Sequence, residues 1–333
     1  MFHSYESDKR AMMKIAFVYT GIAGYMTDCW RALGSLPDVE LRVWLEDMKE
    51  YRFNGNREEA LRGIDVKWEY SENISTTWLK GVESEIESFA PNVLFVCGWS
   101  RRLPPFVANS NKLKDIPMVL DFDMPWEWKF RKIAAKFIMR RKLHRYSAAF
   151  VPGETTATYA RWLGFQDKQI FKGRNCIDVD KFKSPYGERV GFLFLGRHVK
   201  EKGLDVLKNA YELYRLKGGN WKLTIPEYVE PMDVPAVMHK HSCLVLPSKW
   251  EPWGVVVLEA LAAGMKTIVS DRVGARFDLP VDEVFKSGDS VGLAEAMLRI
   301  EKSEKLDGNI DLSNYSTSSW THRVFEICER CRK

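Results

Sequence analysis

Residues 245–264 of the chain read VLPSKWEPWGVVVLEALAAG. The apolar start completes a short strand over Cys243–Pro247, the polar middle is a loop that carries Glu251, and a helix is predicted over Val255–Ala263. A strand, a loop and a helix in succession form the repeating unit of parallel α/β sheets, in which ligands bind at the carboxyl ends of the strands. We therefore expect the loop around Glu251 to line a ligand site.

The two acids of this segment suit a sugar nucleotide. The unpaired N–H groups at the start of the predicted helix can bind a diphosphate. Glu259, in the first turns of that helix, can accept hydrogen bonds from two ribose hydroxyls, and Glu251 can hold a hydroxyl of the sugar. The alternative is that Glu251 is a solvent-exposed acid and that the helix dipole favours Glu259 near a helix start.

The segment resembles the Glu-x7-Glu motif of glycosyltransferase family four, whose members have the GT-B fold. The match includes Pro-Ser before Glu251 and Glu-Ala-Leu-Ala-Ala-Gly from Glu259 onward. The resemblance implies that Glu251 contacts the donor sugar and that Glu259 contacts the ribose of the nucleotide. It further implies that the donor is bound by the residues that follow Glu251, which are Pro252, Trp253, Gly254, Val255 and Val256.

A second similarity lies upstream, where the predicted strand Gly191–Leu195 is followed by Gly196-Arg197 and then by Glu201-Lys202-Gly203. This resembles the family's Gly-Arg…Glu-Lys-Gly segment and implies that Gly196, Arg197 and Lys202 bind the donor diphosphate. Fixed cations can stabilise the negative charge of a leaving nucleoside diphosphate without a metal ion. We therefore expect Glu251, Arg197 and Lys202 to be the catalytic residues, with no metal and no other cofactor. A solvated charged turn is the alternative.

Three further segments extend the resemblance over most of the chain. Gly21 and Gly24, after the first strand, resemble the family's N-terminal glycine-rich loop and are expected to approach the donor phosphates. Asn175–Asp178 with Phe182 resembles the segment that closes the first domain. Trp320–Cys331 resembles the terminal helix that crosses back to the N-terminal domain.

Strand-like and helix-like segments alternate along the chain, and the pattern restarts after a polar stretch at 183–189. The sequence predicts an α/β protein of the GT-B type, with two Rossmann-like, doubly wound domains facing each other across a cleft. We expect an acceptor domain at 12–183, completed by the C-terminal helix at 315–333, and a donor-nucleotide domain at 184–314. The other predicted elements are Lys14–Tyr19, Met26–Leu33, Leu41–Leu45, Val66–Tyr70, Thr77–Phe89, Val93–Val96, Met118–Leu120, Ala148–Pro152, Glu154–Leu163, Leu204–Leu216, Trp221–Ile225, Val234–Lys240 and Thr267–Ser270.

Two features depart from the family's pattern. Many members carry a histidine near the acceptor on a Thr-x-His-Asp motif, and Phe122 stands at that position here, so no histidine base is expected. Asp121 or Asp123 is then the candidate for positioning the acceptor. These two acids also mimic an Asp-x-Asp metal site, but the predicted cation pair already supplies the charge of a metal. The segment that shapes the nucleobase pocket is shortened to Thr224–Pro235, which leaves the base undefined.

Residues 126–145 are predicted to form a basic helix with apolar residues at helical spacing. One interpretation is a helix that lies on an anionic membrane surface, which would favour a lipid-linked acceptor. The other is a helix packed on the core with a solvated basic face. No nucleic-acid-binding module accompanies these charges, so no nucleic-acid partner is expected. The cations are Lys129, Arg131, Lys132, Lys136, Arg140, Arg141, Lys142 and Arg145.

The composition indicates a globular protein of the cytoplasm. The 333 residues are 45% hydrophobic and 29% charged, which is enough for two cores, and the net charge of +5 is mild. Cys328 and Cys331 have no second cysteine pair that would complete a zinc site, and reduced thiols fit the cytoplasm. No apolar run can span a bilayer and residues 1–11 lack the core of a signal peptide. We expect a cytoplasmic enzyme, peripheral on the inner membrane face if the basic helix binds lipid.

The sequence thus predicts a glycosyltransferase of the hexosyltransferase type. The donor would be a UDP- or GDP-linked sugar, and the acceptor a glycan or a lipid-linked molecule of cell-surface polysaccharide or glycoconjugate synthesis. The resembled family transfers sugars with retention of configuration. The alternatives are another GT-B activity, such as a phosphorylase or an epimerase, and a degenerate homologue that only binds a partner.

Overall fold

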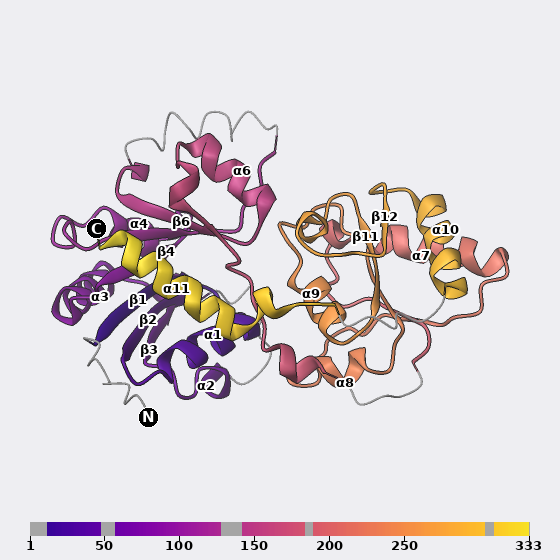
Figure 1. Ribbon diagram of the computed structural model, residues 1–333, viewed down its shortest axis with the longest axis horizontal. Coiled ribbons are helices and arrows are strands. Elements are labelled where there is room, and N and C mark those ends of the chain that lie inside the picture. The colour runs from indigo at the N-terminus through magenta and orange to yellow at the C-terminus, as the bar shows by residue number, and fades with distance from the viewer. Residues whose placement is uncertain (1–11, 48–56, 128–141, 184–188, 304–309, 333) are drawn as a thin grey trace, which may run out of the picture.

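The computed structural model describes residues 12–47, 57–127, 142–183, 189–303 and 310–332, and it contains two parallel β-sheets with helices packed on them (Figure 1). The first sheet has the strand order β3-β2-β1-β4-β5-β6-β7 and the second has the order β12-β11-β10-β8-β9. In both sheets the chain returns to a central strand and then winds outward in the other direction, which is a doubly wound topology.

The first sheet is buried on both faces, as its nearly continuous apolar strands predict. One face carries α1 and α11, and the other carries α3, α4 and α6. Its strands are β1 (Met13–Thr20), β2 (Val39–Asp47), β3 (Val66–Tyr70), β4 (Val93–Cys97), β5 (Met118–Asp121), β6 (Tyr146–Val151) and β7 (Ile170–Lys172). Its helices are α1 (Gly24–Gly34), α2 (Arg57–Ala60), α3 (Thr76–Phe89), α4 (Leu103–Ala108), α6 (Glu154–Leu163) and α11 (Thr317–Cys331).

The second sheet is smaller and also separates two cores. Its strands are β8 (Phe192–Leu193), β9 (Leu223–Thr224), β10 (Cys243–Leu246), β11 (Lys266–Ser270) and β12 (Glu283–Phe285). Its helices are α7 (Leu204–Leu216), α8 (Val234–Met238), α9 (Val255–Ala262) and α10 (Ser290–Lys302).

Helix α11 returns from the second sheet to the first, as the sequence predicts. Figure 1 shows it lying along α1, and the indole of Trp320 stacks on Phe17 of β1 with ring centroids 5.8 Å apart. The crossing chain is fixed by a parallel bridge between Ile177 and Ser316. The predicted division between 183 and 184 stays a prediction, because residues 184–188 lie outside the described part.

Most of the predicted elements are present, and α6 and α7 have the predicted bounds. The sequence analysis missed β7, β12, α2, α4 and α10. The two strands have three residues each and lie at sheet edges, where pairing with a neighbour rather than a local pattern defines them. Most of the predicted basic helix, residues 128–141, lies outside the described residues.

Candidate functional site

The loop between β10 and α9 is built as the sequence predicts, and its backbone is fixed at both ends. The N–H of Glu251 donates to the carbonyl of Arg272 at 3.2 Å, and its own carbonyl accepts from the N–H of Gly274 at 3.2 Å. Gly254 then takes φ of +102°, a left-handed conformation that turns the chain into α9. Glu251 therefore stands on a rigid support at the carboxyl end of the second sheet.

Lys202 and Glu251, which the sequence assigns to the same donor, form an ion pair. Lys202 Nζ contacts Glu251 Oε2, and the same oxygen accepts from the hydroxyl of Ser248 at 3.3 Å. The two charged side chains are only 16% and 11% exposed, so the pair is largely shielded from water. The loop of Lys202 is also held to the loop of Glu251, since the N–H of Lys249 donates to the carbonyl of Glu201 at 2.7 Å.

The remaining predicted donor residues range from exposed to fully buried. Gly196 and Arg197 lie on the exposed turn that follows β8, and Pro252, Val255 and Val256 are half-buried. Trp253 is different, because it is 1% exposed and its ring packs 6.0 Å from that of Tyr315. A direct contact of Trp253 with a donor stays a prediction, whereas its packing in the second core is observed.

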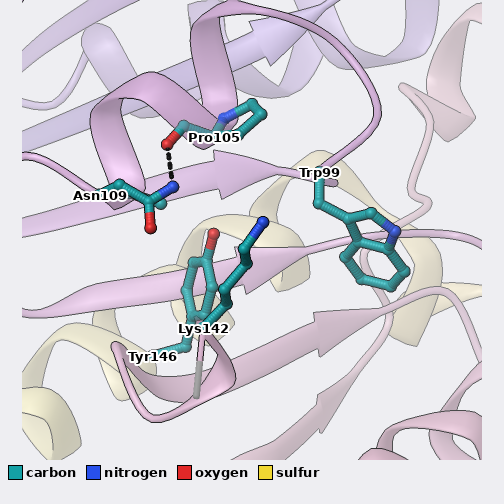
Figure 2. A pocket seen from close by; sticks show the side chains of 6 residues that line it. Trp99, Pro105, Asn109, Lys142 and Tyr146 are labelled. Atoms are coloured by element: carbon teal, nitrogen blue, oxygen red, sulfur yellow. Dashed lines mark hydrogen bonds between the residues drawn. The ribbon is translucent and has the colours of Figure 1, made fainter. Parts of the chain in front are cut away.

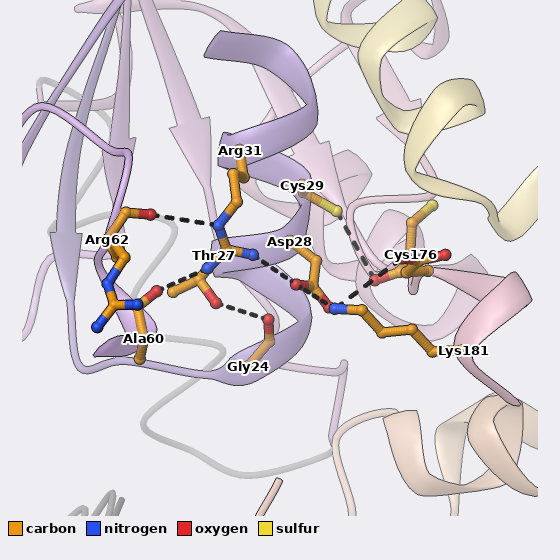
Figure 3. A network of polar contacts seen from close by, with 10 residues as sticks. Gly24, Thr27, Asp28, Cys29, Arg31, Ala60, Arg62, Cys176 and Lys181 are labelled. Atoms are coloured by element: carbon orange, nitrogen blue, oxygen red, sulfur yellow. Dashed lines mark hydrogen bonds and ion pairs between the residues drawn. The ribbon is translucent and has the colours of Figure 1, made fainter. Parts of the chain in front are cut away.

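Glu259 is half-buried on α9 and lies near the other domain. Burial raises the pKa of its carboxyl to about 7, and the negative charge of Asp28 on α1 adds to the shift. Figure 3 shows how Asp28 is held: it accepts from Arg31 at 2.8 Å and from Lys181 at 2.7 Å. The acid predicted to bind ribose thus lies within electrostatic reach of the first sheet's domain.

The N-terminal glycine loop reaches the second domain. Gly21 has φ of +75° at the end of β1, and its N–H donates to the carbonyl of Glu46 at 3.1 Å. A Cβ at Gly24 would lie 3.7 Å from Pro231, which belongs to the segment Thr224–Pro235. The loop predicted to approach the phosphates therefore lies beside the segment predicted to shape the nucleobase pocket.

Asp121 and Asp123 lie in very different surroundings. Asp121 is fully buried and pairs with the guanidinium of Arg174, while Asp123 is exposed. Arg174, itself 4% exposed, also donates to the hydroxyl of Tyr19 and to Asn175 Oδ1. Burial raises the pKa of Asp121 and the positive charge of Arg174 opposes this. The acceptor role of both acids stays a prediction. What the structure shows for Asp121 is that its carboxylate pairs with the buried guanidinium of Arg174.

The sequence analysis missed Arg174. Its only local signal is its place beside Asn175, in the segment that resembles the end of the family's first domain. Two of its partners, Asp121 and Tyr19, are 53 and 155 residues away along the chain, so only the fold brings them to Arg174.

Phe122, at the position of the family's histidine, lies in an aromatic cluster. It is 4% exposed, and its ring centroid lies 5.6 Å from that of Trp99 and 6.1 Å from that of Tyr159. Trp99 also lines a small pocket beside α4 (Figure 2). The other residues that line it are Pro105, Ala108, Asn109, Lys142 and Tyr146.

Within the described residues, no three histidine, cysteine or acidic side chains gather in a way that could hold a metal ion. The six cysteines are free thiols. The same residues include no helix that is long and apolar enough to cross a membrane.

With this geometry in view, the chain can be compared with known proteins. Residues 217–316 match the family model of glycosyl transferases group 1. The matched range contains Glu251, Glu259 and the whole loop between β10 and α9, but less than half of the chain. Mannosylfructose-phosphate synthase of Agrobacterium fabrum (strain C58 / ATCC 33970) is 29% identical over 79 residues, which cover 24% of this chain and 17% of that protein.

Solved structures resemble the chain over nearly its full length. Anabaena Alr3699/HepE, solved in complex with UDP and glucose, has a TM-score of 0.73 at 14% identity, over 95% of this chain and 99% of that chain. The UDP-GlcNAc 2-epimerase of Methanocaldococcus jannaschii has a TM-score of 0.62 at 13% identity, over 95% of this chain and 99% of that chain. The fold of the chain is therefore GT-B, with two parallel-sheet α/β domains, as the sequence predicts.

Proposed function

We propose that the chain is a glycosyltransferase that uses a nucleotide sugar. The observation that carries this proposal is the ion pair of Lys202 and Glu251 at the carboxyl end of the second sheet. Glu251 lies inside the range 217–316 that matches glycosyl transferases group 1, and Lys202 precedes that range. A cation and an acid that meet there can serve the two halves of one donor, the diphosphate and the sugar. The complexes of Anabaena Alr3699/HepE with UDP and with UDP-glucose support a nucleotide-sugar partner.

In the proposed reaction, Lys202 exchanges a carboxylate oxygen of Glu251 for an oxygen of the diphosphate. Arg197 joins it, and the two cations stabilise the charge that develops as the nucleoside diphosphate leaves. Glu251, released from Lys202, accepts from a hydroxyl of the sugar, and Glu259 accepts from the ribose. Catalysis of this kind needs no metal, and the resemblance to family four supports a hexose transferred with retention.

Calorimetric titration of the protein with UDP, GDP and ADP, each with and without EDTA, tests this function. We expect one of the diphosphates to bind with an affinity that EDTA does not change, because protein cations supply the charge. A screen of the matching nucleotide sugars against glycan and lipid-linked acceptors then identifies the substrates. A folded sample that binds no nucleotide would favour the degenerate homologue, and binding restored only by manganese would contradict the metal-independent site.

The affinity for a nucleotide sugar is expected to rise with pH through the pKa of Glu259. Burial holds this pKa at about 7, and ribose hydroxyls donate to the ionised carboxylate, so binding favours loss of the proton. UDP-glucose, whose doubly substituted diphosphate does not titrate here, should bind about tenfold more tightly at pH 8 than at pH 6. Calorimetry measures the dissociation constant at each pH, and the Glu259→Gln variant should bind UDP-glucose weakly at both pH 6 and pH 8. An unchanged pH profile in that variant would assign the titration to another group.

The acceptor side supports a lipid-linked molecule. Trp99 and Trp126 are half-buried aromatic side chains at the end of the first sheet where Phe122 replaces the family's histidine. Trp99 precedes the predicted basic segment 126–145 and Trp126 is its first residue, and we propose that this segment binds an anionic membrane surface of the cytoplasmic side. Co-sedimentation with anionic but not with neutral vesicles tests this, and equal recovery with both would count against it.

An epimerase is the second candidate, because the epimerase of Methanocaldococcus jannaschii shares the fold. Incubation with UDP-GlcNAc alone separates the two functions. An epimerase changes the sugar without an acceptor, whereas a transferase releases UDP and joins the sugar to another molecule.

A further inference from the structure

Asp278 joins the loop of Glu251 to the other domain. It is half-buried and follows the short helix η5 (Gly274–Phe277). Its Oδ2 accepts from the indole Nε1 of Trp253 at 2.9 Å, two residues beyond Glu251. Its Oδ1 accepts from the N–H of Glu154 at 3.0 Å, at the start of α6 in the first sheet's domain. One carboxylate therefore bonds to both domains.

On the donor side, backbone hydrogen bonds connect the segment before Asp278 to the loop of Glu251. The N–H of Ala275 donates to the carbonyl of Trp253 at 2.8 Å, and the N–H of Gly274 donates to that of Glu251 at 3.2 Å. A Cβ at Gly274 would overlap the carbonyl of Pro252, so the two backbones are packed as closely as glycine allows. A displacement of Asp278 relative to α6 would therefore be shared by the loop of Glu251.

On the acceptor side, Asp278 acts as a helix cap supplied by another domain. The N-cap residue of α6 is Gly153, which has no side chain to bond the first N–H groups of the helix. A carboxylate at this end is favoured because it bonds an otherwise unpaired N–H and because it faces the positive end of the helix dipole. A Cβ at Gly153 would overlap the carboxyl group of Asp278, which shows how closely the cap fits. One residue on, the carbonyl of Thr155 accepts from the N–H of Trp126 at 3.1 Å, at the entry to the basic segment.

We propose that Asp278 is a positioning residue that fixes the sugar-binding loop of Glu251 relative to the acceptor domain. The inference rests on the proposed function. Transfer requires the donor sugar, held by the second domain, and the acceptor, held by the first, to meet in one geometry, and a misplacement of about 1 Å can reduce a rate about 100-fold. Most of the residues proposed to bind the nucleotide sugar lie in the second domain, so we expect nucleotide binding to depend less on this contact than transfer does.

Hydrogen–deuterium exchange with three variants tests the inference. Asp278→Ala removes both bonds, and Trp253→Phe removes only the bond to the loop while keeping an aromatic ring. Asp282→Ala is the matched control, because Asp282 also accepts from a backbone N–H, that of Thr267 at 2.8 Å, but within the second domain. Exchange at the amide of Glu154 should rise about tenfold in Asp278→Ala, the effect of losing a hydrogen bond of ~1.4 kcal/mol, and stay unchanged in Asp282→Ala.

Addition of UDP separates the positioning role from a merely structural one. In the unaltered protein, UDP should slow exchange in residues 251–256 and also in the first turn of α6. In Asp278→Ala and Trp253→Phe, the loop should still be protected while the protection of α6 is lost. Protection of α6 that persists in both variants, or unchanged basal exchange at Glu154, would overturn the inference. If UDP, GDP and ADP protect nothing in the unaltered protein, the proposed function fails, and a rise in exchange at Glu154 then leaves Asp278 as an interdomain cap without a role in transfer.

Discussion

Glu251→Ala is expected to lower the rate of sugar transfer by about 10²- to 10³-fold, while nucleotide affinity is unchanged or increased. The loss follows from removing the acid that orients the sugar as the diphosphate leaves. The gain follows from the ion pair, since Lys202 in this variant has no carboxylate partner at 251 to exchange before it binds phosphate. Initial rates at saturating donor give the first quantity, and calorimetry with the matching nucleotide gives the second.

Glu295→Ala is the matched control for this variant. Glu295 also pairs with a lysine, Lys217 at 3.2 Å, but both side chains are about half exposed, and such a pair contributes little. It should change neither quantity measurably. Transfer that survives in Glu251→Ala would contradict the assignment of the sugar-binding acid, and lost nucleotide binding in a folded sample would show that Glu251 supports the site only structurally.

Arg174→Leu is expected to destabilise the first sheet's domain by about 3–5 kcal/mol. Arg174 is 4% exposed and Asp121 is fully buried, so the variant leaves an uncompensated carboxylate inside the core. The loss of unfolding free energy relative to the unaltered protein should become smaller as the pH falls from 7 to 5. Without Arg174, burial raises the pKa of Asp121 with no opposing charge, so the folded state takes up a proton more readily than the unfolded state does and the stability of the variant rises as the pH falls. Urea unfolding followed by circular dichroism at the two pH values measures both effects.

The double variant Arg174→Leu/Asp121→Leu controls for loss of packing. Replacement of both charges by apolar side chains removes the buried carboxylate, so much of the lost stability should return and its dependence on pH should flatten. A double variant as unstable as Arg174→Leu would show that shape, rather than charge compensation, makes Arg174 important.

The sequence alone determined the fold class and the part of the candidate site that carries Glu251 and Glu259. Alternating apolar strands and amphipathic helices specify parallel sheets through local periodicity, and the span from Glu251 to Glu259 fits on one loop and one helix. For this reason α6, α7 and α9 are predicted within one residue at each end, and the matched range 217–316 contains both acids.

Only the tertiary structure decided which charges meet. Lys202 is 49 residues from Glu251, Arg174 is 53 residues from Asp121, and Asp278 is 124 residues from Glu154. An isolated lysine, arginine or aspartate has the same local pattern whether it is solvated or paired. The physical reason is that pairing depends on burial and on which strand ends lie side by side, and both are properties of the folded sheets rather than of any one segment.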